Sequence, residues 1–380
     1  MSKTSLAIIL LATLVLTLIV PAVSGISLLQ QAKAATSNQN GMNGIIDRCN
    51  GSCSANGGEG GIGNDGTGTS YNGNGGHGGQ IVECYSLFMG KIIFGSISCN
   101  VSGGRGGAFN NHNSQASLNG NGGNGLGMKC ALEPPGGHCL SVGGDGGAYN
   151  SDNSGLSSNG NGGNAGHVIC SFESVEALPH CNSAGGQGGS FNSGNSFGRN
   201  GDGGEGGTVT VLGIGGRAVA FGGEGGFNNR DNHFHNRCGT GGAGGDVIGG
   251  GSSYGGNAGN GDSSNGFCGA NGGTGGFALG SGSETNGGNG GVEHGNGGDG
   301  GMALFGGTVN GESGTNNGNG GDGGLAMGPG SVANGENGHE GGLAIGAGSD
   351  ANGGGMAVEG GNTANGGGFA DDGATHPGCD

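Results

Sequence analysis

Cysteine is the residue type whose spacing in this sequence points most directly to chemistry. The chain has 380 residues and 11 cysteines. Six of them form three pairs, each placed symmetrically about the middle of an apolar segment in three successive repeats, so the two thiols of a pair can meet across a turn. Disulfides persist mainly in oxidising compartments. The predicted disulfides are Cys84–Cys99, Cys130–Cys139 and Cys170–Cys181.

The other five cysteines are assigned from their positions relative to the repeats. Cys238 and Cys268 lie at matching positions before the glycine blocks of adjacent repeats, which predicts a disulfide between those repeats. Cys49 and Cys53 can pair across the segment CNGSC. Cys379 is then left as an unpaired thiol or as a link to another chain.

Metal binding is the alternative chemistry for the cysteines and the ten histidines. CNGSC has no second matched pair at the spacing of a zinc finger, and no H-E-x-x-H motif occurs. His233 and His235 stand in an Asn-rich segment where a solvated loop is the simpler interpretation. The stretch 60–65 resembles the start of a calcium-binding repeat, but it occurs once, and such sites need consecutive copies. We therefore expect no metal site and no cofactor.

Motifs of enzymes are missing from the sequence. Gly90 and Lys91 are followed by Ile92, so no phosphate-binding loop is completed. Strings of the form GxGxxG carry no information when 112 residues are glycine. We predict no catalytic residues and a protein that is not an enzyme. Asn50 and Asn100 begin sequons and are candidate glycosylation sites.

Composition and charge exclude several classes of partner and of fold. Only 10% of the residues are charged, Trp is absent, and the formal net charge is −17. Binding to nucleic acid needs clustered Lys and Arg, so we expect no nucleic-acid partner. Glycine loses more backbone entropy on ordering than any other residue, so an ordinary side-chain core cannot order this chain. Order must come mainly from backbone hydrogen bonds.

The N-terminus has the layout of a secretory signal. Lys3 precedes an uncharged apolar run from Leu6 to Val23, and a small-residue cleavage site follows near Ala34. Residues 1–34 are therefore interpreted as a signal peptide, with an uncleaved membrane anchor as the alternative. The chain is expected to be extracellular or attached to the cell surface, with no other membrane segment.

Repetition organises the rest of the chain. Each early repeat has two glycine blocks joined by two different arms, one polar and rich in Asn, the other apolar and strand-like. The predicted divisions are an N-terminal segment at 35–56, two-arm repeats with disulfide-linked arms at 57–254, shorter repeats at 255–370, and a tail at 371–380. Blocks of the form GGxGG begin at Gly57, Gly103, Gly143, Gly185, Gly222 and Gly287.

The expected fold is a solenoid of mostly coil and β structure, with little helix beyond the signal peptide. The apolar arm from Thr208 to Phe221 reads as a β-hairpin with a Gly turn. The glycine blocks, called struts below, cannot be collagen, because six prolines and no three-residue register are present. They are expected to be extended or polyglycine-II-like, with amides bonded laterally to neighbouring struts. A flexible Gly-rich linker is the alternative.

The alternation of GGxGG blocks with apolar triplets, such as those starting at Leu325 and Leu343, resembles the glycine-rich repeat domains of the PGRS type. The resemblance spans roughly residues 55 to 370. It implies polyglycine-II sandwiches and an exported, cell-surface location. The chain departs from that family in its many cysteines and in lacking the helical PE-type domain.

Three functions remain open. The first is a structural or adhesive component of a cell surface or matrix, with the chain itself or a wall glycan as partner. The second is ice binding, which needs a regular rank of Thr or Ala on a flat face. The third is a glycan-binding adhesin whose polar arms form the contact surface and whose aromatic residues stack on sugars or pack over the glycine blocks. Those aromatic residues are Phe109, Tyr149, Phe191, Phe197 and Phe234.

Overall fold

The structure is a computed structural model of the chain. In the residues that it describes, the fold is entirely strand and coil, without a helix. Three separate segments, 30–31, 363–364 and 369–371, are described in addition to the main range. The main range is 41–358 apart from 44–47, 51, 62–63, 66–68, 79–80, 86, 89–90, 93–96, 114, 133–136, 173–179, 213–216, 228, 231–234, 258–269, 291–295, 312–319, 336–341 and 353–355.

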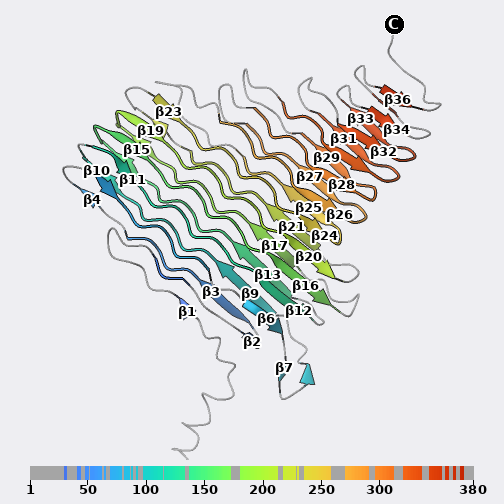
Figure 1. The fold of residues 1–380 in the computed structure, drawn as a ribbon, viewed down its shortest axis with the longest axis horizontal. Helices are drawn as coiled ribbons and strands as arrows, with labels where there is room; N and C mark the ends of the chain where they lie inside the picture. The colour runs from blue at the N-terminus through green and yellow to red at the C-terminus, as the bar shows by residue number, and fades with distance from the viewer. Residues whose placement is uncertain are drawn as a thin grey trace, which may run out of the picture.

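Two long parallel sheets, named sheet A and sheet B here, run along the molecule (Figure 1). Sheet A consists, in spatial order, of β1 Gln30–Gln31, β3 Cys53–Asn56, β9 Ile97–Ser102, β13 Gly137–Val142, β17 His180–Ala184, β21 Arg217–Phe221, β25 Gly251–Tyr254, β27 Glu284–Asn286, β29 Thr308–Asn310, β31 Val332–Asn334, β33 Asp350–Asn352 and β35 Thr363–Ala364. Sheet B consists of β2 Arg48–Asn50, β6 Ile81–Tyr85, β12 Met128–Leu132, β16 Val168–Phe172, β20 Val209–Leu212, β24 Val247–Ile248, β26 Phe277–Leu279, β28 Met302–Leu304, β30 Leu325–Met327, β32 Leu343–Ile345, β34 Met356–Val358 and β36 Phe369–Asp371.

Two shorter parallel sheets, C and D, lie at the far end of the early coils (Figure 1). Sheet C consists of β22 Asn229–Arg230, β18 Asn192–Ser193, β14 Asn150–Ser151, β10 Asn110–Asn111 and β4 Asn64–Asp65. Sheet D consists of β23 His235–Arg237, β19 Phe197–Arg199, β15 Leu156–Ser158, β11 Ser117–Leu118 and β5 Ser70–Tyr71. Among the described strands, β7 Leu87–Phe88 and β8 Lys91–Ile92 form an antiparallel pair.

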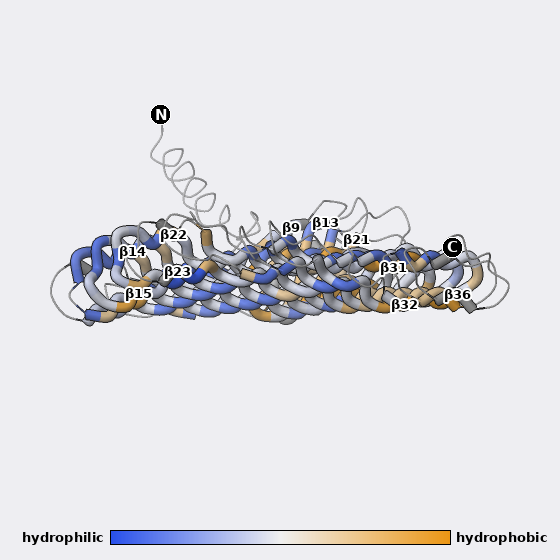
Figure 2. Tube along the Cα trace, turned by 90° about the horizontal axis from the view of Figure 1, so that it is seen from above, coloured by the Kyte–Doolittle hydropathy of each residue, from blue (hydrophilic) through white to orange (hydrophobic). Residues whose placement is uncertain are grey.

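Each early coil goes out along one layer and returns along the other. The chain leaves a strand of sheet A through a glycine strut, turns through sheets C and D, and returns through a second strut to sheet B. Seen edge-on in Figure 2, the described chain is a thin slab. Strands and struts from successive coils lie side by side, so each coil is ordered by its neighbours.

Hydrogen bonds between struts follow a repeating pattern. Gly103 donates its N–H to the carbonyl of Val142, in the next coil of the same layer. Gly104 donates to Gly76 across the two layers, and Gly123 in turn donates to Gly104. This zigzag continues through the centre of the slab as far as Gly298, whose N–H bonds the carbonyl of Gly288. The lateral bonding expected of the struts is present.

Glycine is required where struts of successive coils lie side by side. A Cβ built on Gly144 would overlap the carbonyl oxygen of Gly104, and one on Gly186 would overlap the carbonyl of Gly144. Both contacts are to backbone, which cannot move aside without breaking the hydrogen bonds.

The β-hairpin expected over 208–221 is wrong. Strand β20 belongs to sheet B and bonds β16 and β24, whereas β21 belongs to sheet A and bonds β17 and β25. Val209 and Val211 of β20 and Ala218 of β21 are buried in one cluster. The two strands of an arm therefore meet through side chains, while their hydrogen bonds go to the neighbouring coils.

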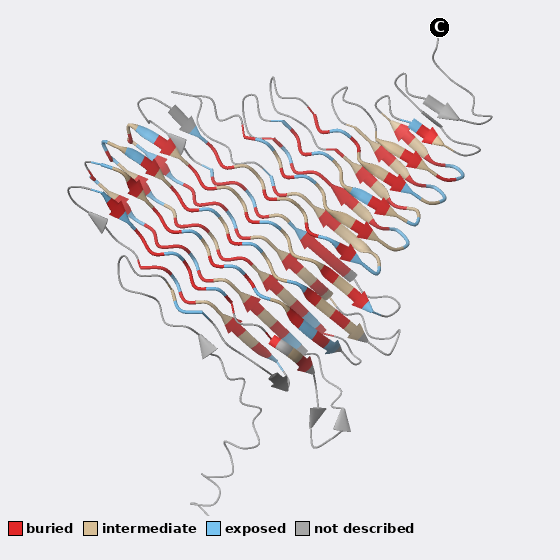
Figure 3. Cartoon of the chain, viewed as in Figure 1, coloured by how far each residue is buried: buried red, intermediate tan, exposed pale blue. Residues whose placement is uncertain are grey.

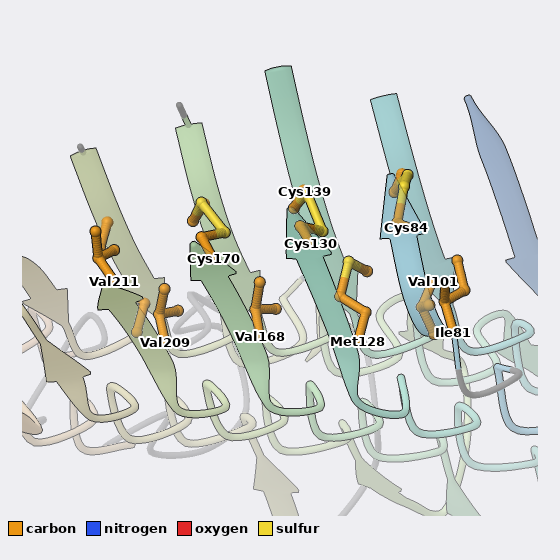
Figure 4. Packing of buried hydrophobic residues seen from close by; sticks show 14 of the residues in the cluster. Ile81, Cys84, Val101, Met128, Cys130, Cys139, Val168, Cys170, Val209 and Val211 are labelled. Atoms are coloured by element: carbon orange, nitrogen blue, oxygen red, sulfur yellow. A yellow bond between two sulfur atoms is a disulfide. The ribbon is translucent and has the colours of Figure 1, made fainter. Parts of the chain in front are cut away.

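The space between sheets A and B changes along the slab. In the early coils it is filled by branched side chains and cysteines, including Ile81, Val101 and Val168 (Figures 3 and 4). In the later coils the buried cluster is almost entirely alanine. That second cluster consists of Ala303, Val309, Ala326, Ala333, Ala344, Ala351 and Ala357.

Candidate functional site

A ladder of disulfides crosses the early part of the core. The structure links the three pairs expected from the spacing, each between a strand of sheet B and a strand of sheet A, with Cα atoms 6.5 to 6.7 Å apart. Their sulfurs are buried between the sheets (Figure 4). The three rungs are Cys84–Cys99, Cys130–Cys139 and Cys170–Cys181.

The rungs are in register because the repeats are in register. Cys99, Cys139 and Cys181 are direct partners along sheet A, and Cys84, Cys130 and Cys170 are partners along sheet B. Beyond the last rung, Val211 and Ala218 take the two cysteine positions. Three disulfide-bonded pairs indicate an oxidising, extracellular environment.

The remaining cysteines are described in part. Cys53 and Cys238 are disulfide-bonded. Cys53 extends the sheet A series, since it pairs in register with Cys99, and their Sγ atoms are 3.6 Å apart. The side chains of the predicted partners, Cys49 and Cys268, lie outside the described residues, as does Cys379. The backbone of Cys49 pairs with Cys84, which places Cys49 and Cys53 at the next rung.

Two groups of three cysteines bring their sulfur atoms within 4.8 Å of one another, the distance range of a metal site. They are Cys53, Cys84 and Cys99, and Cys130, Cys139 and Cys170. All six are disulfide-bonded, and a disulfide sulfur is not the thiolate that zinc or copper requires. The spacing of the rungs therefore explains both groups. The side chains of His233, His235, Asn64 and Asp65 lie outside the described residues.

The Asn-rich arms contain buried ladders of asparagine side chains. Asn119 donates its side-chain amide to Asn159 at 2.8 Å, and Asn159 donates to Asn200 at 3.1 Å. A second series joins Asn113 to Asn153 at 3.1 Å and Asn153 to Asn195 at 2.9 Å. All six asparagines are buried. One planar amide both donates and accepts, so identical Asn residues in successive coils satisfy each other.

The outward-facing side chains of the struts also bond one coil to the next. Asn121 donates its backbone N–H to Asn74 Oδ1, and Asn161 donates to Asn121 Oδ1, both at 2.8 Å. The same row continues to Asp202 and Thr240. The side chain of each outward residue thus accepts the one strut N–H that faces solvent in the following coil.

An aromatic ladder, Phe109, Tyr149, Phe191 and Phe227, lies at the edge of the struts. Its first three rings stack with centroids 4.9 and 4.7 Å apart and planes within 4° of parallel. Phe227 meets Phe191 edge-on at 5.4 Å. All four side chains are exposed at their edges. The faces of the stacked rings therefore contact one another, and the ring edges are left exposed.

The backbone of this ladder is strained. Phe109, Tyr149 and Phe191 have φ values of 69°, 68° and 66°, a region that bulky residues rarely adopt. Beside the rings lies an open hollow of about 250 Å³ that Arg105 and Asp145 also line. Arg105 and Asp145 are 3.4 Å apart and exposed, so their ion pair contributes little to stability.

Two other groups of predicted residues have fixed places. Phe197 lies in β19 with an exposed side chain, whereas Phe234 lies outside the described residues. Asn100 lies in β9, between β3 and β13, and its Oδ1 is buried. The side chain of Asn50 is outside the described residues.

In the later coils the outer face of sheet A carries another asparagine ladder. Asn310 donates to Asn286 Oδ1 and Asn334 donates to Asn310 Oδ1, both at 2.7 Å, and Asn352 donates to Asn334 Oδ1 at 2.6 Å. Neither the buried asparagine ladders of the early coils nor the outer ladder of the later coils was predicted from the sequence. The signal was present, because Asn recurs at a constant offset from each glycine block or apolar triplet.

Within the described ranges, no helix has the length and apolar character needed to cross a membrane.

Comparisons with known proteins place few limits on function. No family model matches the chain, and no curated protein matches it. Among solved structures, a springtail antifreeze protein from Granisotoma rainieri, described as a bundle of nine polyproline type II helices, is 23% identical. The match covers 46% of this chain and 90% of that one, with a TM-score of 0.14. A TM-score this low does not establish a shared fold.

Proposed function

We propose that this chain is an exported, non-catalytic structural or adhesive repeat protein of a cell surface or extracellular matrix. The observation that carries the proposal is the in-register stacking of the same side chain in coil after coil, in the cysteine, asparagine and aromatic ladders. Such stacking yields long flat surfaces and a stiff slab, which suit support or adhesion. It gathers no convergent set of catalytic groups among the described residues.

The struts are proposed to be polyglycine-II helices. Their hydrogen bonds support this conformation. The N–H of Gly103 bonds the next coil of the same layer, the N–H of the next residue, Gly104, bonds the other layer, and the third residue, Arg105, is exposed to solvent. Three directions in three residues match a helix with three residues per turn. A strut of this kind has no internal hydrogen bonds and needs its neighbours.

The location is tested with an antibody raised against the recombinant chain and applied to intact and permeabilised cells of the source organism. Free thiols are alkylated before lysis, and peptides are mapped without reduction. The expected result is a signal on intact cells with the three rungs oxidised. A signal that needs permeabilisation, with alkylated Cys130 and Cys139, contradicts an exported role.

A glycan surface is the second candidate, and the strained aromatic ladder favours it. Three successive coils retain an aromatic residue at a backbone conformation that glycine would adopt without strain. The exposed ring edges and the hollow beside Arg105 and Asp145 offer apolar and polar contacts together. Co-sedimentation with insoluble chitin, cellulose and peptidoglycan tests it. Tyr149→Ala is expected to reduce sedimentation several-fold, with the exposed Phe305→Ala as the control. Equal loss in both variants removes this candidate.

Ice binding is less well supported by the outward strut positions. The row of Asn74, Asn121, Asn161 and Asp202 is amide and carboxylate, and the rank of Thr or Ala that ice binding requires is not formed there. A thermal hysteresis measurement on the recombinant chain decides the question. Hysteresis at micromolar protein would replace the structural proposal.

A further inference from the structure

The outer face of sheet B in the later coils is apolar. Strands β26, β28, β30, β32 and β34 each direct their central alanine inward and their two flanking residues outward. Because the strands pair residue for residue, the flanking residues form two straight rows. This apolar face consists of Phe277, Met302, Leu325, Leu343 and Met356 in one row, and Leu279, Leu304, Met327, Ile345 and Val358 in the other.

These side chains are not needed to hold the two sheets together. The space between the sheets is closed by buried alanines such as Ala326 and Ala344, with the larger side chains outside. In the early coils large apolar side chains such as Val168 lie inside, and the outer side carries both the polar Lys129 and the exposed Leu212. Large apolar residues placed on the outside of a strand indicate that something else covers them.

The contrast is confined to one face of the slab. On the outer face of sheet A in the same coils, the corresponding positions carry the polar Thr308 and the hydrogen-bonded Asn310 and Asn334. In Figure 2 the hydrophobic colour gathers near β32 and β36 at this end of the molecule. A general excess of apolar residues would have affected both faces.

We propose that the apolar face binds the same face of a second copy of this chain. Three methionines of the face, Met302, Met327 and Met356, are 37, 38 and 45% exposed, and the other seven residues are partly exposed. Together they present on the order of 500 Å² of apolar area, so two copies bury about 1,000 Å², the lower end of a specific interface. Contacts of the flanking turns and struts add to this area.

Shape and charge both favour a copy over a lipid surface. Two flat sheets with straight rows can pack face to face about a two-fold axis, as the sheets of a sandwich do. The ten residues include no charge, while Asp299 and Asp322 border the face in the struts that lead into β28 and β30. With a net charge of −17, the chain is repelled by anionic membranes, and the ten residues of the face include no Lys, Arg or Trp to anchor it to one. The inference rests on the fold and not on the proposed location.

The first test is sedimentation velocity of the full mature chain between about 1 μM and 1 mM, a range that spans moderate dimer affinities. The patch variant, which changes the apolar face, is Leu304→Lys with Met327→Lys, adjacent residues of one row. Its matched control is Thr308→Lys with Val332→Lys, adjacent residues in the same coils on sheet A. Circular dichroism confirms that both variants fold. The wild type should dimerise, the patch variant should weaken dimerisation by about 100-fold or more, and the control should resemble the wild type.

The second test needs no substitution. Oxidation by peroxide is followed at Met302, Met327 and Met356, with the 66% exposed Met42 as the internal control. We expect the three methionines of the apolar face to be protected from oxidation several-fold as the protein concentration rises, while Met42 is not protected. A wild type that stays monomeric throughout, or equal weakening in both double variants, overturns it. Protection by phosphatidylcholine vesicles at concentrations where the protein is monomeric overturns it in favour of a lipid surface.

Discussion

The early coils, which hold residues 81–221, and the later coils, which hold residues 277–358, form one continuous pair of sheets with opposite packing. In the early coils the sheets are joined by Val, Ile and disulfides, and the outer sides mix polar residues such as Lys129 with exposed apolar ones such as Leu212 and Phe221. In the later coils they are joined by alanine, and one outer side is apolar. The backbone ladder is therefore sufficient to stack the coils, and side chains between the sheets can vary from disulfides to methyl groups.

Glycine also has two different tasks, one in the struts and one in the turns. In the struts of the early coils it leaves room for a neighbouring backbone, as Gly186 does for the carbonyl of Gly144. In the turns of the later coils it provides a positive φ, as Gly282 does at 68° with no atom within 4 Å of a built Cβ. The same residue type is thus required for space in the struts and for conformation in the turns.

Replacing a strut glycine should have the largest effect. Gly186→Ala is expected to destabilise the early coils by about 3 kcal/mol or more, because backbone must move in a close-packed bundle. The exposed neighbour Gln187→Ala should change stability by less than about 0.5 kcal/mol. Gly282→Ala should cost about 1 kcal/mol, from the positive φ alone. Urea unfolding monitored by circular dichroism gives the free energy of unfolding of all three variants. Equal losses of stability in Gly186→Ala and Gly282→Ala would contradict the difference between strut and turn glycines.

Removing a disulfide should affect the early coils alone. The double variant Cys170→Ala with Cys181→Ala is expected to lose about 3 kcal/mol, since the rung closes a short loop in the unfolded chain. Hydrogen exchange read by mass spectrometry should show faster exchange in β16, β17 and their neighbours. Exchange in β30 and β32 should stay unchanged, because each coil contacts only adjacent coils. Faster exchange along the whole chain would show that the two regions unfold as one unit.

Enlarging the alanine layer should destabilise the later coils. Ala344→Val adds two methyl groups between closely packed sheets, with an expected loss of about 2 kcal/mol. Ile345→Val, on the outer side of the same strand, is the control and should lose less than about 1 kcal/mol. The difference is measured by hydrogen exchange of β30, β32 and β34. A neutral Ala344→Val would mean that the later sheets are not held at alanine spacing.

The smallest effect is expected on the outer asparagine ladder. Asn334→Ala removes two hydrogen bonds, to Asn310 and from Asn352, at a half-buried site, and should cost about 1 kcal/mol. Asn334→Asp keeps the shape but brings no side-chain donor, so a similar loss is expected. Thermal unfolding at neutral pH measures both. No change in either variant would show that water replaces the ladder.

Much of the architecture could be predicted from the repeats. The two arms, the lateral bonding of the struts and the pairs such as Cys130–Cys139 follow from constant offsets within each repeat, because stacked coils place equal positions side by side. The hairpin could not be rejected in that way. The alternating apolar residues in 209–221 fit a strand with one buried face. They do not say whether the backbone hydrogen bonds of that strand go to the next strand of the same arm or to the next coil.

The misread surfaces have a common physical cause. Asn119 and Asn159 belong to arms that the sequence marks only as polar, yet their side chains are buried and their amides satisfy one another once the coils are in register. The triplet Leu325–Ala326–Met327 predicts a strand without saying which side faces inward. Size settles it, since the narrow space between the sheets admits the alanine. The burial of the asparagines and the inward side of the triplet both depend on contacts between coils, and a local sequence pattern does not contain those contacts.

The zigzag of glycine hydrogen bonds has a consequence for the length of such a protein. Between the glycine struts of the early coils, bonds within a layer run from an earlier N–H to a later carbonyl, as from Gly103 to Val142, whereas bonds across layers run from a later N–H to an earlier carbonyl, as from Gly104 to Gly76. The two sets of peptide dipoles oppose each other along the axis of the slab, unlike those of an α-helix, which add up. Further coils therefore add no growing electrical field at the ends. A gene that duplicates its repeat can therefore lengthen the slab without building up a peptide dipole at its ends.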